Sequence, residues 1–239
     1  MQAIETLLFD FGGTLDSDGV AWKERFHALY RAEGLDLSAE AFAPAFYAAD
    51  DALVGALAPT TGLKGTVDAL TANLEVELAR RGAGTGGGGI DAARGQRVAS
   101  RFLSEMSAAF ARNGPVLKAL SERYRLGVVS NFYGNLEAVC ESAGLAPLFG
   151  VMTDSQRVGV EKPEPAIFRA ALTALQASPE TTVMVGDSLR RDYEGARRSG
   201  MGFIWIATED VQAVERDGAA DRSVFASVTE LPNLLDILT

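Results

Sequence analysis

Four side chains that lie far apart in the sequence could together handle a phosphoryl group: Asp10, Ser130, Lys162 and Asp187. The carboxylates of Asp10 and Asp187, with a backbone carbonyl, would form a small oxygen-ligand site of the kind that suits Mg²⁺. The hydroxyl of Ser130 and the ammonium group of Lys162 would neutralise and orient a phosphoryl group. A carboxylate beside that group could attack it and form an acyl phosphate. These residue types therefore favour phosphoryl chemistry supported by a metal ion.

Asp10 stands where a short apolar run ends. The run Leu7–Phe9 precedes it, and Gly12 and Gly13 follow almost at once. This pattern predicts a buried strand that leads into a tight turn, with a carboxylate at the carboxyl end of the strand. The two glycines let the backbone approach a bound group closely, and successive N–H groups in such a turn can hold an anion.

Strand and helix patterns alternate through the second half of the chain. Strands separated by helices predict a parallel sheet with right-handed crossovers. The carboxyl ends of parallel strands meet at one edge of a sheet, so the four side chains should converge there. The predicted strands after Leu7–Phe9 are Leu126–Val129, Phe149–Thr153, Thr181–Val185 and Gly202–Ala207, and the predicted helices are Leu117–Arg123, Leu136–Ala143, Pro165–Leu175 and Tyr193–Ser199.

The section between the first strand and this alternating part has helical patterns only. We therefore predict an inserted all-helical domain at residues 17–111, and a core formed by residues 1–16 and 112–239. The glycine-rich stretch Gly82–Gly89 lacks the strand-to-helix context of a nucleotide-binding loop and is interpreted as a surface linker. The predicted helices of the insert begin near Trp22 and then cover Ala39–Leu57, Thr66–Arg81 and Ile90–Ala111.

The composition excludes several classes of protein. A net charge of −10 and a pI near 4.7 argue against a nucleic-acid partner and against binding to anionic membranes. The only cysteine, Cys140, cannot form an intramolecular disulfide, and the chain shows neither a signal peptide nor a membrane-spanning run. We expect a cytoplasmic protein with a small-molecule substrate. The sequence does not indicate whether the protein is a monomer or an oligomer.

Taken together, four motifs make the chain resemble the haloacid dehalogenase-like hydrolase superfamily. They are D-F-G-G-T-L from Asp10, S-N at Ser130, G-V-E-K-P-E-P around Lys162, and G-D-S at Asp187 with Asp192 five residues on. The helical insert occupies the position of that family's first-type cap domain. The resemblance implies a Rossmann-like, doubly wound core, a Mg²⁺ cofactor, and an aspartyl nucleophile that acts on phosphate esters.

The resemblance also implies a role for each matching residue. Asp10 would be the nucleophile and a metal ligand, joined at the metal by the Gly12 carbonyl and by Asp187. Lys162 would steady the charge on Asp10 and on the phosphate, and Asp192 would orient Lys162 or a metal-bound water. The residues expected to bind the phosphoryl oxygens are Thr14 and Ser130, with Asn131 beside them.

One position departs from the family pattern. Phosphatases of this family carry a second aspartate two residues after the nucleophile as general acid/base, and here that position is Gly12. Losing such a group costs about 10²–10⁴-fold in rate. If Gly12 is needed only for its carbonyl, Gly12→Asp should raise phosphatase activity. The candidates for a substitute acid are Asp16, Asp18, Glu24 and His27.

Three functions remain open from the sequence. The first is a Mg²⁺-dependent hydrolase that acts on a small phosphorylated metabolite through an aspartyl-phosphate. The second is C–P bond cleavage like that of phosphonoacetaldehyde hydrolase, in which a cap lysine forms a Schiff base, with Lys64 as the candidate. The third is a degenerate member that binds a phosphorylated ligand or a partner protein without turnover. The dehalogenating branch of the family also lacks the second aspartate but needs no metal. The G-D-S motif at Asp187 with Asp192 indicates a metal site and therefore argues against dehalogenation.

Overall fold

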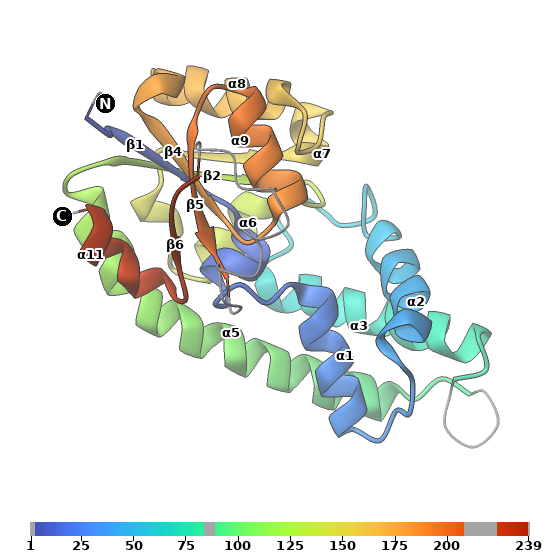
Figure 1. The fold of residues 1–239 in the computed structure, drawn as a ribbon. Helices are drawn as coiled ribbons and strands as arrows, with labels where there is room; N and C mark the ends of the chain where they lie inside the picture. The colour runs from blue at the N-terminus through green and yellow to red at the C-terminus, as the bar shows by residue number, and fades with distance from the viewer. Residues whose placement is uncertain (1–2, 84–88, 208–223, 239) are drawn as a thin grey trace.

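The first strand, β1 (Thr6–Phe9), lies in the middle of a six-stranded sheet whose strands are all parallel (Figure 1). The computed structural model describes residues 3–83, 89–207 and 224–238. The strand order is β3-β2-β1-β4-β5-β6, which confirms the predicted doubly wound parallel sheet. The other strands are β2 (Arg125–Ser130), β3 (Val151–Asp154), β4 (Thr182–Gly186), β5 (Gly202–Ile206) and β6 (Val224–Val228).

The register of the three central strands brings their carboxyl ends together. Phe9 of β1 lies opposite Val128 of β2 on one side and Val185 of β4 on the other. The backbone continues this pairing for one more residue, because the Asp10 N–H donates to the Val185 carbonyl at 2.9 Å. Asp10 therefore lies at the same edge of the sheet as the ends of β2 and β4.

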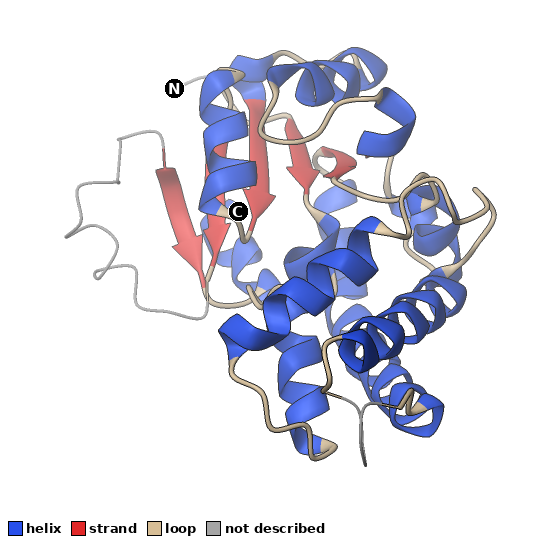
Figure 2. Ribbon diagram, turned by 90° about the vertical axis from the view of Figure 1, so that its right-hand side faces the viewer, coloured by secondary structure: helices blue, strands red, loops and turns tan. Residues whose placement is uncertain are grey.

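Helices cover both faces of the sheet, as the alternation of strand side chains requires. Leu8 points to the face covered by α8 (Pro165–Leu175) and α9 (Glu194–Arg198), where it joins a cluster with Phe168 and Ala196. Leu7 and Phe9 point to the opposite face, toward α6 (Leu136–Ser142), the end of α5 (Ala92–Ser121) and α11 (Leu234–Leu238). Figure 2 shows the strands between these two helical layers. A four-residue helix, α7 (Ser155–Val158), follows β3.

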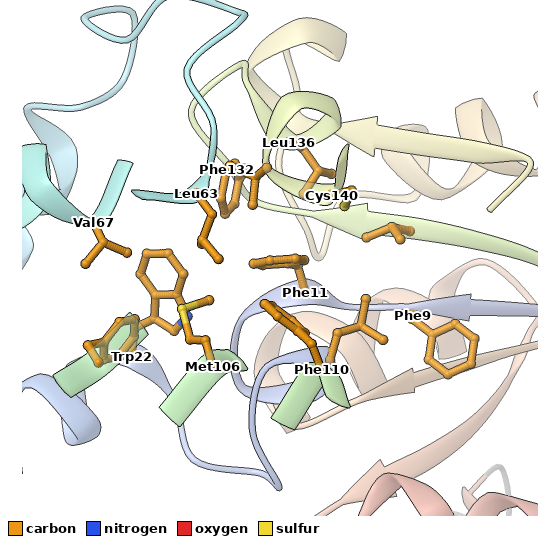
Figure 3. Packing of buried hydrophobic residues seen from close by; sticks show 14 of the residues in the cluster. Phe9, Phe11, Trp22, Leu63, Val67, Met106, Phe110, Phe132, Leu136 and Cys140 are labelled. Carbon is orange, nitrogen blue, oxygen red and sulfur yellow. The ribbon is translucent and has the colours of Figure 1, made fainter. Parts of the chain in front are cut away.

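The inserted section is helical, and its helices lie beside the carboxyl edge of the sheet. Besides the first part of α5 it contains α1 (Trp22–Ala32), α2 (Ala39–Asp51) and α3 (Leu63–Arg80). Stacked rings hold the helices together, with the Phe26 and Phe102 centroids 4.2 Å apart. One continuous apolar cluster runs from this section into the sheet, from Trp22 and Val67 to Phe9 (Figure 3).

Helix α5 differs most from the sequence prediction. The predicted helices Ile90–Ala111 and Leu117–Arg123 are one unbroken helix of 30 residues that includes Pro115. The buried stripe from Val98 to Leu120 stabilises it, because tertiary packing of an apolar face outweighs the unfavourable propensity of a single proline. The proposed domain boundary at residues 111 and 112 therefore falls inside a helix.

Other predicted bounds shift by a few residues. The helix predicted to end at Leu57 ends at Asp51, and the strand predicted from Phe149 begins at Val151. The sequence interpretation missed β6, and most of the predicted linker Gly82–Gly89 lies outside the described residues. No helix in the part of the chain that the structure describes is long and apolar enough to cross a membrane.

Candidate active site

A pocket of about 520 Å³ opens at the carboxyl edge of the sheet, between the strand ends and the helical insert. Its walls come from segments that are more than 170 residues apart in sequence, since Asp10 and Asp187 both line it. The strand ends and the loops beside them contribute Asp10, Gly12, Ser130, Asn131, Lys162 and Asp187. Residues predicted from separate motifs thus share one cavity.

Three donors converge on a single oxygen of Asp10. Its Oδ1 accepts from the Phe11 N–H at 2.7 Å and from the Ser130 hydroxyl at 2.8 Å, and lies 2.7 Å from the Lys162 ammonium. No donor contacts Oδ2 among the described residues. The carboxylate is therefore held in one orientation while one of its oxygens stays available for chemistry.

Lys162 lies between two carboxylates. Its ammonium is 2.7 Å from Asp10 Oδ1 and 2.7 Å from Asp192 Oδ1, and the side chain is almost fully buried. Burial acts to lower the pKa of Lys162, but the charges of Asp10 and Asp192 outweigh it and raise the pKa above its ordinary value. The lysine therefore stays protonated and supplies a fixed positive charge beside Asp10.

The carboxylates of Asp10, Asp187 and Asp192 are crowded. One oxygen of each lies within 4.8 Å of the others. Burial, and after it the charges of Asp10 and Asp192, raise the pKa of Asp187 to about 8. A cation would relieve this repulsion. Asp192 already uses both oxygens, one on Lys162 and one on the Ser188 N–H at 3.0 Å, so Asp10 and Asp187 are the oxygen donors open to a divalent ion.

Two predicted phosphate ligands have other contacts here. The Thr14 hydroxyl is buried and donates to Asp187 Oδ1 at 3.3 Å, and Thr14 is not among the residues that line the pocket. Asn131 does line the pocket, but its amide exchanges hydrogen bonds with the backbone of Lys162, at 2.7 and 3.2 Å. Asn131 thereby ties the end of β2 to the loop that carries Lys162.

The space beside Gly12 is filled by an indole. A Cβ atom on Gly12 would lie 3.2 Å from Trp22 Nε1. That nitrogen donates to Asp16 Oδ2 at 2.7 Å, and the same oxygen accepts from Arg25 at 2.8 Å. Asp16 Oδ1 accepts from the Gly13 N–H at 2.7 Å. Asp16 is thus a buried anchor for Trp22, and it does not line the pocket.

The other proposed substitute acids lie in different places. Asp18 pairs with Arg112 at 2.7 Å, and the His27 ring is hydrogen-bonded to the Leu37 carbonyl at 2.8 Å. Neither lines the pocket, whereas Glu24 does. Lys64, the proposed Schiff-base lysine, is 78% exposed, pairs with Asp68 and lies outside the pocket lining.

Sequence reasoning missed most of the pocket wall that the insert contributes. Trp22 and Phe46 fit the apolar stripes of their helices, and no sequence signal separates a pocket residue from a packed one. Tyr133 is close to a recognised motif, two residues after Asn131. The missed lining residues include Trp22, Lys23, Phe46, Tyr47, Asp50, Tyr133, Arg191 and Trp205.

The Trp22 indole changes the expected outcome of filling position 12. The backbone at Gly12 (φ −75°, ψ 124°) accepts any residue, so only the indole opposes a side chain. We expect Gly12→Ala and Gly12→Asp to lower the free energy of unfolding by about 1–3 kcal/mol through overpacking. The matched control is Gly114→Ala, where the added Cβ meets no atom and a helical alanine stabilises by about 0.5–1 kcal/mol. Denaturant unfolding measures all three; a Gly12→Asp protein as stable as the wild type would contradict this packing.

The fold and the pocket together define a class of protein. It has an α/β core and a helical insert, and the pocket between them contains the carboxylates of Asp10 and Asp187 and the ammonium group of Lys162. A sequence model of the haloacid dehalogenase-like hydrolase family matches residues 4–200. The chain therefore belongs to the haloacid dehalogenase-like hydrolase family, as the motifs predicted.

Individual relatives share only part of the chain. Haloacid dehalogenase-like hydrolase domain-containing protein 3 of Bos taurus is 36% identical over 115 residues, which is 48% of this chain and 46% of that protein. A glyceraldehyde 3-phosphate phosphatase of Methanothermobacter thermautotrophicus is 35% identical over 122 residues, covering 48% of this chain and 53% of the relative. The chain spans about half the length of these curated relatives.

Solved structures match along the full length. The HAD-hydrolase YfnB from Bacillus subtilis, bound to magnesium, has a TM-score of 0.58 at 19% identity and covers 99% of both chains. The L-2-haloacid dehalogenase RSc1362 has a TM-score of 0.62 at 22% identity, also over 99% of both chains. At these identities the likeness shows the fold alone.

Proposed function

We propose that this protein is a Mg²⁺-dependent hydrolase that cleaves a small phosphorylated metabolite through an aspartyl-phosphate at Asp10. The observation that supports this most is the arrangement at Asp10. Three donors occupy Oδ1, which leaves Oδ2 as the attacking oxygen. Phosphatases among the relatives support the substrate class.

In this mechanism Asp10 Oδ2 attacks the phosphorus atom while the bond to the leaving oxygen breaks. Lys162 stays charged and stabilises both the carboxylate and the incoming phosphoryl oxygens. Ser130 and the Phe11 N–H hold the nucleophile still, so little reorganisation is needed during attack. Water then attacks phosphorus in the aspartyl-phosphate, which releases phosphate and regenerates Asp10.

The proposed metal site consists of Asp10, Asp187 and the Gly12 carbonyl. A Mg²⁺ ion bound there would supply positive charge to the transferring phosphoryl group. Thr14 orients Asp187 through its hydrogen bond. Asp192 anchors Lys162, because its two oxygens accept hydrogen bonds from Lys162 and from the Ser188 N–H and leave none for the metal.

Schiff-base chemistry is not favoured by either lysine of the insert. Lys64 is far too exposed and lies outside the pocket lining. Lys23 does line the pocket, but hydrogen bonding to Glu24 raises its pKa, so the neutral amine that a Schiff base requires is disfavoured.

A panel of phosphate esters, each with and without Mg²⁺, tests the proposed function. We expect turnover that depends on Mg²⁺ and is absent in Asp10→Asn. If no ester is turned over, yet phosphorylated compounds raise the melting temperature, the protein is a binding protein and the proposal is wrong.

Magnesium should also stabilise the folded protein. At an ion concentration one hundred times the Kd, the gain in free energy of unfolding is about 2.7 kcal/mol. Asp187→Ala should remove this gain, because it removes one of the two carboxylates open to the ion. Asp68→Ala, which deletes an exposed carboxylate of the insert, is the matched control and should keep the gain. Thermal unfolding with and without Mg²⁺ measures the gain in each variant. If Mg²⁺ stabilises Asp187→Ala as much as the wild type, the metal binds elsewhere.

A further inference from the structure

Hydrolysis at this site needs a proton for the leaving oxygen, and residue 12 has no side chain to give one. Four carboxylic acids line the pocket: Asp10, Glu24, Asp50 and Asp187. The proposed function uses Asp10 as the nucleophile and Asp187 at the metal. Glu24 and Asp50 are therefore the carboxyl groups left in the pocket among the described residues.

The surroundings of these two acids differ. The Glu24 side chain is 51% exposed and pairs with Lys23 at 3.1 Å. Asp50 is partly buried in the last turn of α2. The Tyr133 hydroxyl donates to its Oδ1 at 2.5 Å, and Oδ2 has no hydrogen-bond partner in the described part of the chain.

Tyr133 connects Asp50 to the reacting groups. It follows Ser130 by three residues, directly after β2, and Ser130 contacts the proposed nucleophile at 2.8 Å. The hydrogen bond between Tyr133 and Asp50 therefore ties a carboxyl group of the insert to the segment that follows the end of β2. Asp50 and Asp10 line the same pocket.

We propose that Asp50, supplied by the helical insert, is the general acid/base that replaces the missing side chain at position 12. This inference rests on the proposed function. In the first half-reaction Asp10 Oδ2 forms its bond to phosphorus, the phosphorus–oxygen bond of the ester breaks, and Asp50 Oδ2 gives its proton to the leaving oxygen. In the second, the Asp50 carboxylate takes a proton from the water that attacks the aspartyl-phosphate. The products are the alcohol and phosphate, and Asp50 is protonated again.

The charges around Asp50 are compatible with this role. Burial raises its pKa most, and the neighbouring acids Asp51 and Glu161 raise it further. The Tyr133 hydrogen bond and the Arg191 guanidinium act in the opposite direction, and the net shift is upward. A carboxyl group with a raised pKa keeps its proton closer to neutral pH, as a general acid must.

The test compares kcat/KM for two esters in the presence of Mg²⁺: p-nitrophenyl phosphate, whose leaving group departs without help, and glycerol phosphate, whose leaving group must be protonated. Asp50→Asn keeps an oxygen that accepts the Tyr133 hydrogen bond but cannot donate an acidic proton. We expect a loss of about 10²–10⁴-fold on glycerol phosphate and a much smaller loss on p-nitrophenyl phosphate.

Two further variants separate acid catalysis from a structural role. Asp68→Asn changes an exposed carboxylate of the insert that lies outside the pocket lining, and should match the wild type. Tyr133→Phe removes the hydrogen bond that positions the acid but keeps the acid itself, so its loss on glycerol phosphate should be smaller than that of Asp50→Asn. In the wild type, kcat/KM for glycerol phosphate should fall as pH rises through the Asp50 pKa, because the protonated donor is lost; Asp50→Asn should lack this limb.

Three results would overturn the proposal. An Asp50→Asn enzyme that hydrolyses glycerol phosphate as well as the wild type shows that Asp50 is no acid. Equal losses on the two esters in Asp50→Asn show that the carboxyl group only holds the insert in place. If the wild type turns over no ester of the panel that tests the proposed function, that function falls and this inference falls with it, whereas the first two results leave the proposed function standing.

Discussion

Asp10→Asn should reduce hydrolysis of every phosphate ester by about 10⁴-fold or more, because an amide cannot act as the nucleophile. The asparagine Oδ1 can still accept from Phe11, Ser130 and Lys162, which all contact Oδ1 in the wild type. The substitution therefore keeps these three contacts and removes the negative charge with which Asp10 would attack phosphorus and help to hold the metal ion. Steady-state kinetics on an activated ester with Mg²⁺ measures the effect.

The matched control for Asp10→Asn keeps the Asp10 charge and changes the neighbouring Ser130. Ser130→Ala removes one of the three donors to Oδ1 but leaves the carboxylate, so activity should fall less than in Asp10→Asn. An Asp10→Asn protein that remains folded and retains more than a few per cent of wild-type activity would exclude Asp10 as the nucleophile.

Lys162→Met should abolish activity and also destabilise the fold. The methionine leaves the buried Asp10 and Asp192 side chains without their shared cation, and breaking a buried pair in this way costs about 3–5 kcal/mol. We expect a large drop in the denaturant midpoint together with loss of turnover.

Lys64→Met provides the comparison, because Lys64 also pairs with an aspartate but is 78% exposed. Exposed ion pairs contribute about 0–1 kcal/mol, so this variant should unfold almost as the wild type does. Equal stability of the two methionine variants would show that Lys162 is not the structural centre of the site.

The central sheet was predictable because its signals are local. An apolar run that ends in Asp10, or in Ser130, marks both a strand and its carboxyl end, and parallel topology then brings those ends together. The motifs around Lys162 and Asp187 add an ammonium group and a carboxylate, and only the combination with Asp10 and Ser130 indicates a phosphoryl site. The structure places all four side chains at one pocket.

The contributions of the insert could not be predicted, because they depend on how distant helices pack. Trp22 fits an ordinary helix stripe, and only the structure shows its indole beside Gly12. Asp50 could not be singled out from the sequence, because its hydrogen-bond partner Tyr133 is 83 residues away. The continuity of α5 through Pro115 likewise follows from packing against both parts of the chain, which no local pattern records.

The most direct measurement traps the covalent intermediate. The wild-type protein is mixed with an activated phosphate ester and Mg²⁺, quenched in acid during turnover, digested, and searched for a phosphorylated peptide. We expect a phosphoryl group on the peptide that contains Asp10, and none on the Asp10→Asn protein treated in the same way. Sustained turnover with no phosphoryl group on Asp10, or with the group on another residue, would contradict it.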